Sequence, residues 1–211
     1  MKKKVFAVLA AVLLAVVFMP AAALADLTYA SSPIGDQSWY SGGADATYGT
    51  SFTNSNAFTV AKLGFFDVGG DGLAYSHDVG IWNAAGTLLG KVTIAAGTTA
   101  PIADGFRWAN LASSVLLSAG NTYIIGATMA KDNSSDLMGN SAKINSPFTL
   151  VSDLYHDNVN LETGLQKPDT TWQSPPTGWY GPNIATPIPA AVWLLGSGLV
   201  GLVAIRRRMK K

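Results

Sequence analysis

An acidic, glycine-rich loop is the part of the sequence whose residue types are best suited to holding a metal ion. Residues 67–72 read Asp-Val-Gly-Gly-Asp-Gly, and Asp78 follows shortly after them. Calcium takes about six to eight oxygen ligands from carboxylates, carbonyls and water, and glycines allow a loop to turn its carbonyls toward one point. The sequence therefore predicts a calcium site formed by Asp67, Asp71 and Asp78.

The same loop also has a simpler interpretation as a turn in which aspartate side chains bind nearby backbone amides. The spacing is not that of an EF-hand, because Asp67 and Asp71 are four residues apart and no glutamate closes the loop. A second acidic run, residues 132–136, is expected to be a solvated turn.

Catalysis by the two histidines, His77 and His156, has little support in the sequence. A serine triad needs partners in a defined order, and there is no G-x-S-x-G elbow. We expect His77 to begin a strand and to bond a backbone carbonyl. Glycoside hydrolysis needs two carboxylates at a set separation, which the 13 acidic residues do not single out. No catalytic residue is predicted, and a hydrolase is the weakest hypothesis.

Aromatic side chains are numerous enough to suggest sugar binding, because their flat faces stack on sugar rings. The aromatics of interest are Trp39, Tyr40, Trp82, Trp108, Trp172, Trp179 and Tyr180. We expect Trp82 and Trp108 to lie in the core, whereas Trp172, Trp179 and Tyr180 fall in proline- and glycine-rich loops where they are expected to be exposed. A module that binds extracellular polysaccharide, or a calcium-dependent adhesion module, is therefore the alternative function.

Short strands must position these residues. Alternating or apolar segments bounded by Gly, Asn and Asp recur about every ten residues. The expected strands are residues 57–67, 77–83, 87–94, 106–111, 115–117, 121–129, 148–151 and 154–161. Turns are expected at 83–86 and 119–121, and residues 26–55 read as loops with one or two edge strands. With no long amphipathic helix between 26 and 185, the sequence predicts an all-β, antiparallel β-sandwich of jelly-roll or immunoglobulin-like type.

Charge is distributed unevenly along the chain. The formal net charge is +1, but eight of the 14 cations lie in the two termini. The region between them keeps six cations against all 13 acidic residues, a net charge of −7. Such a surface argues against a nucleic-acid partner, which requires basic patches. The absence of cysteine excludes disulfides and thiol chemistry.

The N-terminus has the three-part organisation of a secretory signal peptide. Residues 2–4 are lysines, residues 5–18 form an apolar run, and Ala23 and Ala25 make an A-x-A peptidase site. Cleavage by signal peptidase is therefore expected before Asp26, which assigns residues 1–25 to the signal helix. An uncleaved membrane helix is the alternative, but the apolar run is shorter than the ~20 residues that a bilayer requires.

The C-terminus has the features of a membrane segment. Pro187 and Pro189 exclude a helix at the start of this region. Residues 190–205 are uncharged and precede five cations, Arg206, Arg207, Arg208, Lys210 and Lys211. A helix of ~24 Å would span a slightly thinned bilayer and leave the cations in the cytoplasm. A buried core helix, the alternative, is disfavoured because the segment is apolar on all faces.

The C-terminal segment also resembles a known sorting signal. The residues from Thr186 to Leu199 read TPIPAAVWLLGSGL and precede the arginine triplet. This arrangement is similar to the VPLPA variant of the PEP-CTERM signals, with Thr186 and Ile188 where valine and leucine are usual. The resemblance implies an exosortase-type protease of a Gram-negative bacterium as a partner. The recognition elements would be Pro187, Ile188, Pro189, Ala190, Arg206, Arg207 and Arg208.

By this resemblance, residues 186–211 hold the protein transiently in the inner membrane until they are processed near the Pro-Ile-Pro-Ala box. Residues 26–185 then form one domain that passes to the envelope, the cell surface or the extracellular matrix. The stretch from about residue 58 to 129, with Leu63 to Asp67, His77 to Trp82 and Ala119 to Tyr123 in order, is similar to an uncharacterised β-sandwich domain of such surface proteins. The expected function is that of a non-enzymatic exported protein.

Overall fold

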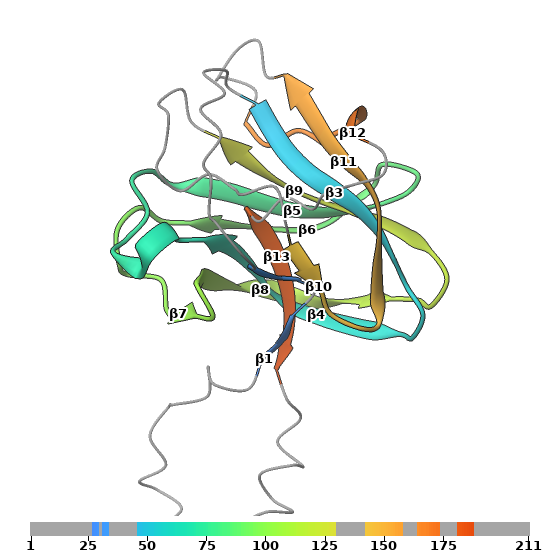
Figure 1. Cartoon of the computed structure of the whole chain (residues 1–211), viewed down its shortest axis with the longest axis horizontal. Coiled ribbons are helices and arrows are strands. Elements are labelled where there is room, and N and C mark those ends of the chain that lie inside the picture. Colours follow the sequence, from blue (N-terminus) through green and yellow to red (C-terminus); the bar gives the residue numbers. More distant parts are fainter. Residues whose placement is uncertain are drawn as a thin grey trace, which may run out of the picture.

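The computed structural model describes residues 27–29, 31–33, 46–129, 142–157, 164–173 and 181–187 of the chain. Within these ranges every regular element is a strand except one 3-10 turn, Val68–Gly70. Two antiparallel sheets form the body of the domain (Figure 1). The prediction of an all-β, sandwich-like fold is therefore confirmed.

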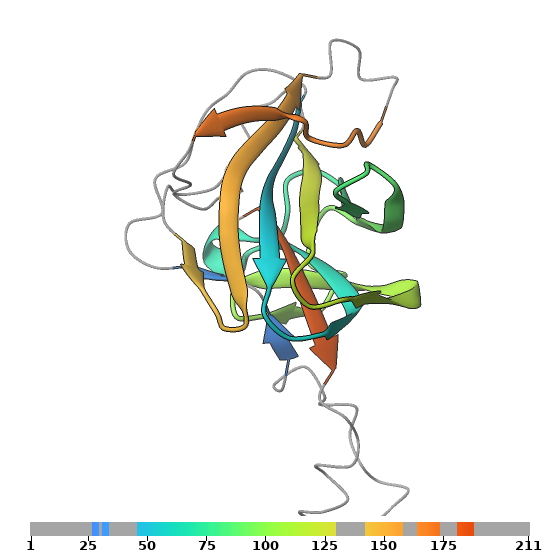
Figure 2. The ribbon, with the colours of Figure 1, turned by 90° about the vertical axis from the view of Figure 1, so that its right-hand side faces the viewer.

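The first sheet has five strands, and the second has six. In spatial order the first contains β1 (Leu27–Tyr29), β13 (Pro182–Pro187), β4 (Phe58–Phe66), β8 (Phe106–Leu117) and β7 (Ile102–Ala103). The second contains β12 (Thr170–Gln173), β11 (Phe148–Asp157), β3 (Ala46–Asn54), β9 (Thr122–Met129), β5 (His77–Asn83) and β6 (Leu88–Ile94). A small ladder joins β10 (Ala142–Ile144) to β2 (Ser31–Pro33). Figure 2 shows the long strands of the second sheet rising beside the first.

Strand β5 follows the predicted alternation and has the predicted bounds. Its inward-facing residues His77, Val79 and Ile81 are fully buried between the sheets. A hairpin joins it to β6, with the Gly86 amide donating to the Asn83 carbonyl at 3.0 Å. Gly86 has a φ of +88°, which favours glycine at this turn. The predicted hairpin at residues 83–86 is confirmed.

The prediction of edge strands within residues 26–55 holds for β1, at the edge of the first sheet, but it missed β3, which lies between β11 and β9 in the middle of the second sheet. Its polar residues are buried there, and the Ser51 hydroxyl bonds the Ser152 hydroxyl at 2.7 Å. A Cβ at Gly49 would lie 2.0 Å from the Ile125 carbonyl oxygen. Only glycine therefore fits at position 49, because the backbone of β9 approaches so closely.

Two strand interruptions expected from the sequence are also absent. β8 continues through Leu111–Ser114, where a register shift changes the pairing from Lys62–Asn110 to Val60–Val115. β11 likewise continues across a shift next to Val151. A β-bulge absorbs extra residues without ending a strand, which explains why a break in the apolar pattern did not mark a strand end.

A short segment, residues 164–169, crosses the second sheet on the face opposite the main core. Leu165 packs there against Trp82, Ile124 and Leu154. The backbone amide of Gln166 donates a hydrogen bond to the Thr47 hydroxyl at 3.3 Å. We call residues 164–169 the strap, and it gives the outer face of this sheet a small second core.

Among the described residues no helix is long and apolar enough to cross a membrane. The predicted signal helix and transmembrane helix both fall outside those residues. So do the cleavage-site residues Ala23, Ala25 and Asp26 and, apart from Pro187, the whole predicted sorting motif.

Candidate functional site

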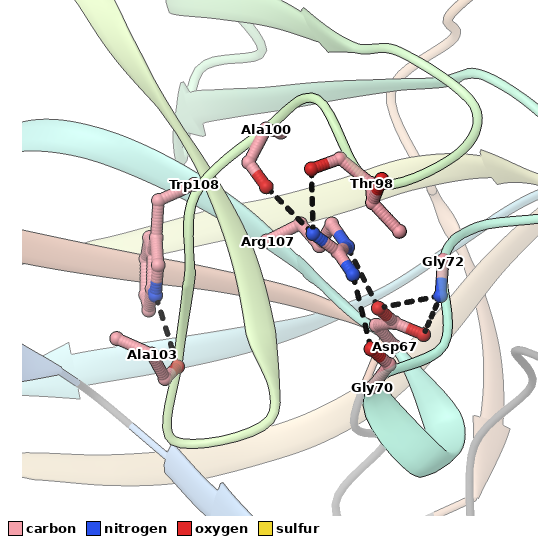
Figure 3. A network of polar contacts seen from close by, with 8 residues as sticks. All are labelled: Asp67, Gly70, Gly72, Thr98, Ala100, Ala103, Arg107 and Trp108. Carbon is pink, nitrogen blue, oxygen red and sulfur yellow. Dashed lines mark hydrogen bonds and ion pairs between the residues drawn. The ribbon is translucent and has the colours of Figure 1, made fainter.

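A buried ion pair occupies the place where the sequence suggested a metal. Asp67 follows β4 and Arg107 lies on β8, and the Arg107 Nε donates to the Asp67 Oδ2 at 2.7 Å (Figure 3). Asp67 is 1% exposed and Arg107 3%. The same carboxylate accepts the Gly72 amide at 3.2 Å. The negative charge of Asp67 is therefore balanced within the domain.

The rest of the guanidinium holds two loops together. Its Nη1 donates to the carbonyls of Ala100, at 2.8 Å, and Thr98, at 3.1 Å, while Nη2 donates to the Gly70 carbonyl at 3.2 Å. Burying a charge is costly unless it is both paired and hydrogen-bonded. Because these conditions are met, the network fixes residues 67–72 against residues 98–101, and its role is structural.

The three aspartates predicted to share calcium are not brought together. Asp71 is exposed within the loop, and Asp78 lies on β5, where its carboxylate accepts a hydrogen bond from the Thr93 hydroxyl. No group of three or more His, Cys, Asp or Glu residues able to hold a metal occurs in the described part of the chain. Sequence reasoning missed Arg107 as the partner of Asp67. The usable signal was an isolated arginine between Phe106 and Trp108 in an apolar strand, which implies a buried carboxylate.

His77 has the structural role expected of it. It begins β5, its Nδ1 lies 2.8 Å from the Thr128 carbonyl oxygen, and its ring stacks on Phe65 with centroids 3.8 Å apart. His156 lies at the surface instead, with Nδ1 3.1 Å from Asp169 Oδ1. This hydrogen bond lowers the pKa of Asp169 below its ordinary value. The two histidines are thus placed at separate structural positions.

The tryptophans divide between core and surface as predicted where the structure describes them. Trp82 and Trp108 are 4% and 2% exposed, and the Trp108 Nε1 donates to the Ala103 carbonyl at 3.2 Å. Trp172 is 50% exposed and packs edge-on against Tyr155 with centroids 5.7 Å apart. It lies on β12, at the edge of the second sheet, rather than in a loop. Trp39, Tyr40, Trp179 and Tyr180 lie outside the described residues.

A shallow pocket of about 340 Å³ lies where the β5–β6 hairpin meets the turn between β8 and β9. Its lining is Asn83, Ala84, Ala85, Leu89, Leu116, Asn121, Thr122 and Tyr123. None of these side chains is charged. Asparagine amides and a threonine hydroxyl can donate and accept hydrogen bonds, while the leucines and alanines offer apolar surface. The pocket is chemically suited to a neutral, hydroxyl-rich ligand.

Residues 33–176 match a family described as a domain of unknown function, DUF4082. The match covers more than half of the chain. The chain belongs to the DUF4082 family. No curated protein matches it.

The DUF4082 match leaves out the two strands that close the first sheet. β1 ends before it begins, and β13 starts after it ends. These strands pair with each other, so that Leu27 faces Pro187 and Thr28 faces Thr186. β13 also continues two residues past the predicted domain boundary at residue 185. The predicted signal-cleavage point thus lies just before this ladder. The first proline of the predicted sorting box, Pro187, is the last residue of the ladder.

Proposed function

We propose that this DUF4082 protein is a non-enzymatic, exported envelope or extracellular-matrix protein that is sorted through its C-terminal segment. In this proposal signal peptidase releases residues 1–25. Residues 186–211 then anchor the chain transiently in the inner membrane through a transmembrane helix until an exosortase-type protease acts near the Pro-Ile-Pro-Ala box. The processed domain reaches the cell surface or the matrix.

The observation that carries this proposal is the ladder between β1 and β13. β1 begins at Leu27, one residue beyond the predicted signal-peptidase site, and β13 ends at Pro187, inside the predicted sorting box. The described strands between these two points form the two main sheets and the small β2–β10 ladder. The two ends of this ladder therefore lie beside the two predicted processing points, which supports a role in export for both terminal segments.

The roles of the buried polar groups support a non-enzymatic domain. Asp67 and Arg107 bind each other and nearby backbone, and His77 is held by a carbonyl and a phenylalanine ring. A catalytic side chain instead has to reach substrate from within a cleft. We further propose that the sandwich is of jelly-roll or immunoglobulin-like type.

Terminal sequencing of the protein recovered from its own cells tests the proposal. We expect a mature N-terminus at Asp26 and the loss of the basic end, Arg206 to Lys211, from the envelope or matrix fraction. A variant with Arg206, Arg207 and Arg208 changed to glutamine should accumulate unprocessed, because cations retain a membrane segment on the cytoplasmic side. Recovery of an intact basic end in the mature pool would instead indicate a permanent single-span protein.

The pocket at the β5–β6 hairpin favours a second function, the binding of a neutral saccharide of the envelope or matrix. Its asparagines and threonine suit sugar hydroxyls, and Leu89 and Leu116 suit the apolar face of a sugar ring. Leu116 is 63% exposed, so its side chain is accessible to a ligand in the pocket. Since no residue of the lining is acidic, the pocket supports binding rather than hydrolysis by paired carboxylates.

Retention on immobilised polysaccharides tests this second function. The wild-type protein is compared with Asn121→Ala and Leu116→Ala, and with Leu88→Ala as the matched control, since Leu88 is also exposed but does not line the pocket. Loss of retention at least tenfold in the two pocket variants alone would support the proposal. Equal retention of all four proteins would place sugar binding elsewhere or exclude it.

A further inference from the structure

The two ends of the described chain leave the domain at one pole. Leu27 pairs with Pro187, and Tyr29 pairs with Ala185. Both views show β1 and the end of β13 at the same extremity, with β12 toward the other (Figures 1 and 2). Ile184 and Ala185 are fully buried and β13 also pairs with β4. This pole, which we call the β1–β13 pole, is therefore a fixed part of the sandwich.

The length of chain beyond Pro187 limits how the domain can sit on a membrane. The uncharged run of residues 190–205 begins three residues after Pro187. Three peptide steps of ~3.8 Å reach at most about 11 Å. The headgroup layer of one leaflet is about 5–8 Å thick. A chain anchored through that run therefore holds Pro187 within a few ångströms of the lipid headgroups.

No other face of the domain can lie against the lipid headgroups when the chain is anchored in this way. A domain of this length has a radius of gyration of ~15 Å, so its far pole lies some 35–40 Å away. A connection of about 11 Å cannot let the far pole turn toward the bilayer.

The charges at the two poles are consistent with this orientation. β1 and β13 contain no charged residue. Lys62, half-buried on β4, pairs with Ala185 beside them. Around β12, Asp157 and Asp169 are exposed, with Lys167 close to Asp169. Neither β1 nor β13 therefore brings a carboxylate of its own toward the bilayer.

We propose that the β1–β13 pole is the membrane-facing surface of the anchored protein and that its partner is the lipid bilayer itself. The inference rests on the proposed anchoring through residues 190–205. The β1–β13 ladder fixes the orientation of the domain on the bilayer. The apolar run of residues 190–205 supplies the affinity for the membrane. The β12 end, with Trp172, consequently points away from the membrane, where a ligand or another envelope component can reach it.

Single cysteines test this orientation without interference, since the chain contains no cysteine. The full chain carrying Thr186→Cys or the matched Thr171→Cys on β12 is labelled with a nitrobenzoxadiazole probe. Each is placed in vesicles of phosphatidylethanolamine and phosphatidylglycerol that contain a headgroup spin label. We expect quenching of the Thr186→Cys probe at least twofold stronger than that of the Thr171→Cys probe. Equal quenching, or stronger quenching at residue 171, would overturn the orientation.

Flotation separates this inference from the proposed function. Protein that fails to float with the vesicles would refute the anchoring, and with it the orientation, whereas protein that floats with the wrong quenching order would refute only the orientation. The pole itself is tested by a disulfide between Thr28→Cys and Thr186→Cys, because opposed residues in a ladder lie within disulfide reach. The Thr28→Cys and Thr171→Cys pair should not cross-link. A reversed result would show that the ladder does not form in the full chain.

Discussion

Arg107 and Asp67, 40 residues apart in the sequence, form an ion pair of 2.7 Å in the interior of the domain. The pair lies at the acidic, glycine-rich loop for which the sequence predicts a calcium site. Arg107 provides the positive charge, and its remaining donors bind the carbonyls of the two loops that it joins. The loop is thereby held by a side-chain ion pair together with hydrogen bonds to backbone groups.

Removing one partner of this pair should strongly destabilise the domain. Asp67→Asn or Arg107→Met leaves the other charge buried without its counterion, which costs about 3–5 kcal/mol. Urea unfolding followed by tryptophan fluorescence measures the loss. The double variant Asp67→Leu/Arg107→Met should lose less than the two single losses together, because no lone charge remains. Additive losses would mean that the two side chains act independently.

Calcium should leave the thermal stability of the domain unchanged. A ligand that binds only the native state raises the melting temperature in proportion to its occupancy. Because the Asp67 carboxylate is already bound by Arg107 and Gly72, we expect the same melting temperature in millimolar calcium and in chelator. An increase of several degrees that Asp71→Asn or Asp78→Asn abolishes would restore the calcium hypothesis.

Two glycine substitutions should differ sharply in their effect on stability. A Cβ at Gly49 meets the backbone carbonyl of Ile125, which cannot move without displacing β9, whereas a Cβ at Gly80 meets the ends of the Leu165 and Trp82 side chains. Gly49→Ala is therefore expected to cost about 3 kcal/mol or more, and Gly80→Ala about 1–2 kcal/mol. Chemical denaturation of both variants checks the order, and similar costs would contradict the close approach of β3 and β9.

The strap should loosen in acid. The hydrogen bond from His156 lowers the pKa of Asp169, so its contribution to stability is present above the pKa of the unfolded chain, near 4, and is lost as the pH falls through the folded value. Both groups are well exposed, with side chains 36% and 49% accessible, so the effect should stay below about 1 kcal/mol.

The variant Asp169→Asn isolates this contribution. Unfolding free energies at pH 6 and pH 2.5 should fall slightly more for the wild-type protein than for Asp169→Asn. Thr171→Ala, two residues further along, serves as a control that keeps the carboxylate and both of its hydrogen-bond partners. An identical pH dependence of wild type and Asp169→Asn would show that the surface pair contributes nothing.

The local sequence pattern alone determined one strand, one hairpin and two core side chains of this protein. The alternation in residues 77–83 determined β5 and its buried face, and Asn83 with Gly86 determined the following hairpin. The placement of Trp82 and Trp108 in the core followed from apolar neighbours. These features depend on side chains and dihedral preferences of residues close in the chain, and such preferences are legible without knowledge of the fold.

Tertiary structure alone decided which distant residues meet. The central place of β3, the pairing of Arg107 with Asp67 and the ladder that joins Leu27 to Pro187 all link segments far apart in the chain. A strand's polar composition does not show whether its neighbours will approach closely enough to bury it, and a carboxylate serves a metal or a guanidinium equally well. Whether a carboxylate binds a metal or a guanidinium depends on which partner the packed sheets bring within reach. A buried charge is stable only where an opposite charge and hydrogen-bonding groups surround it.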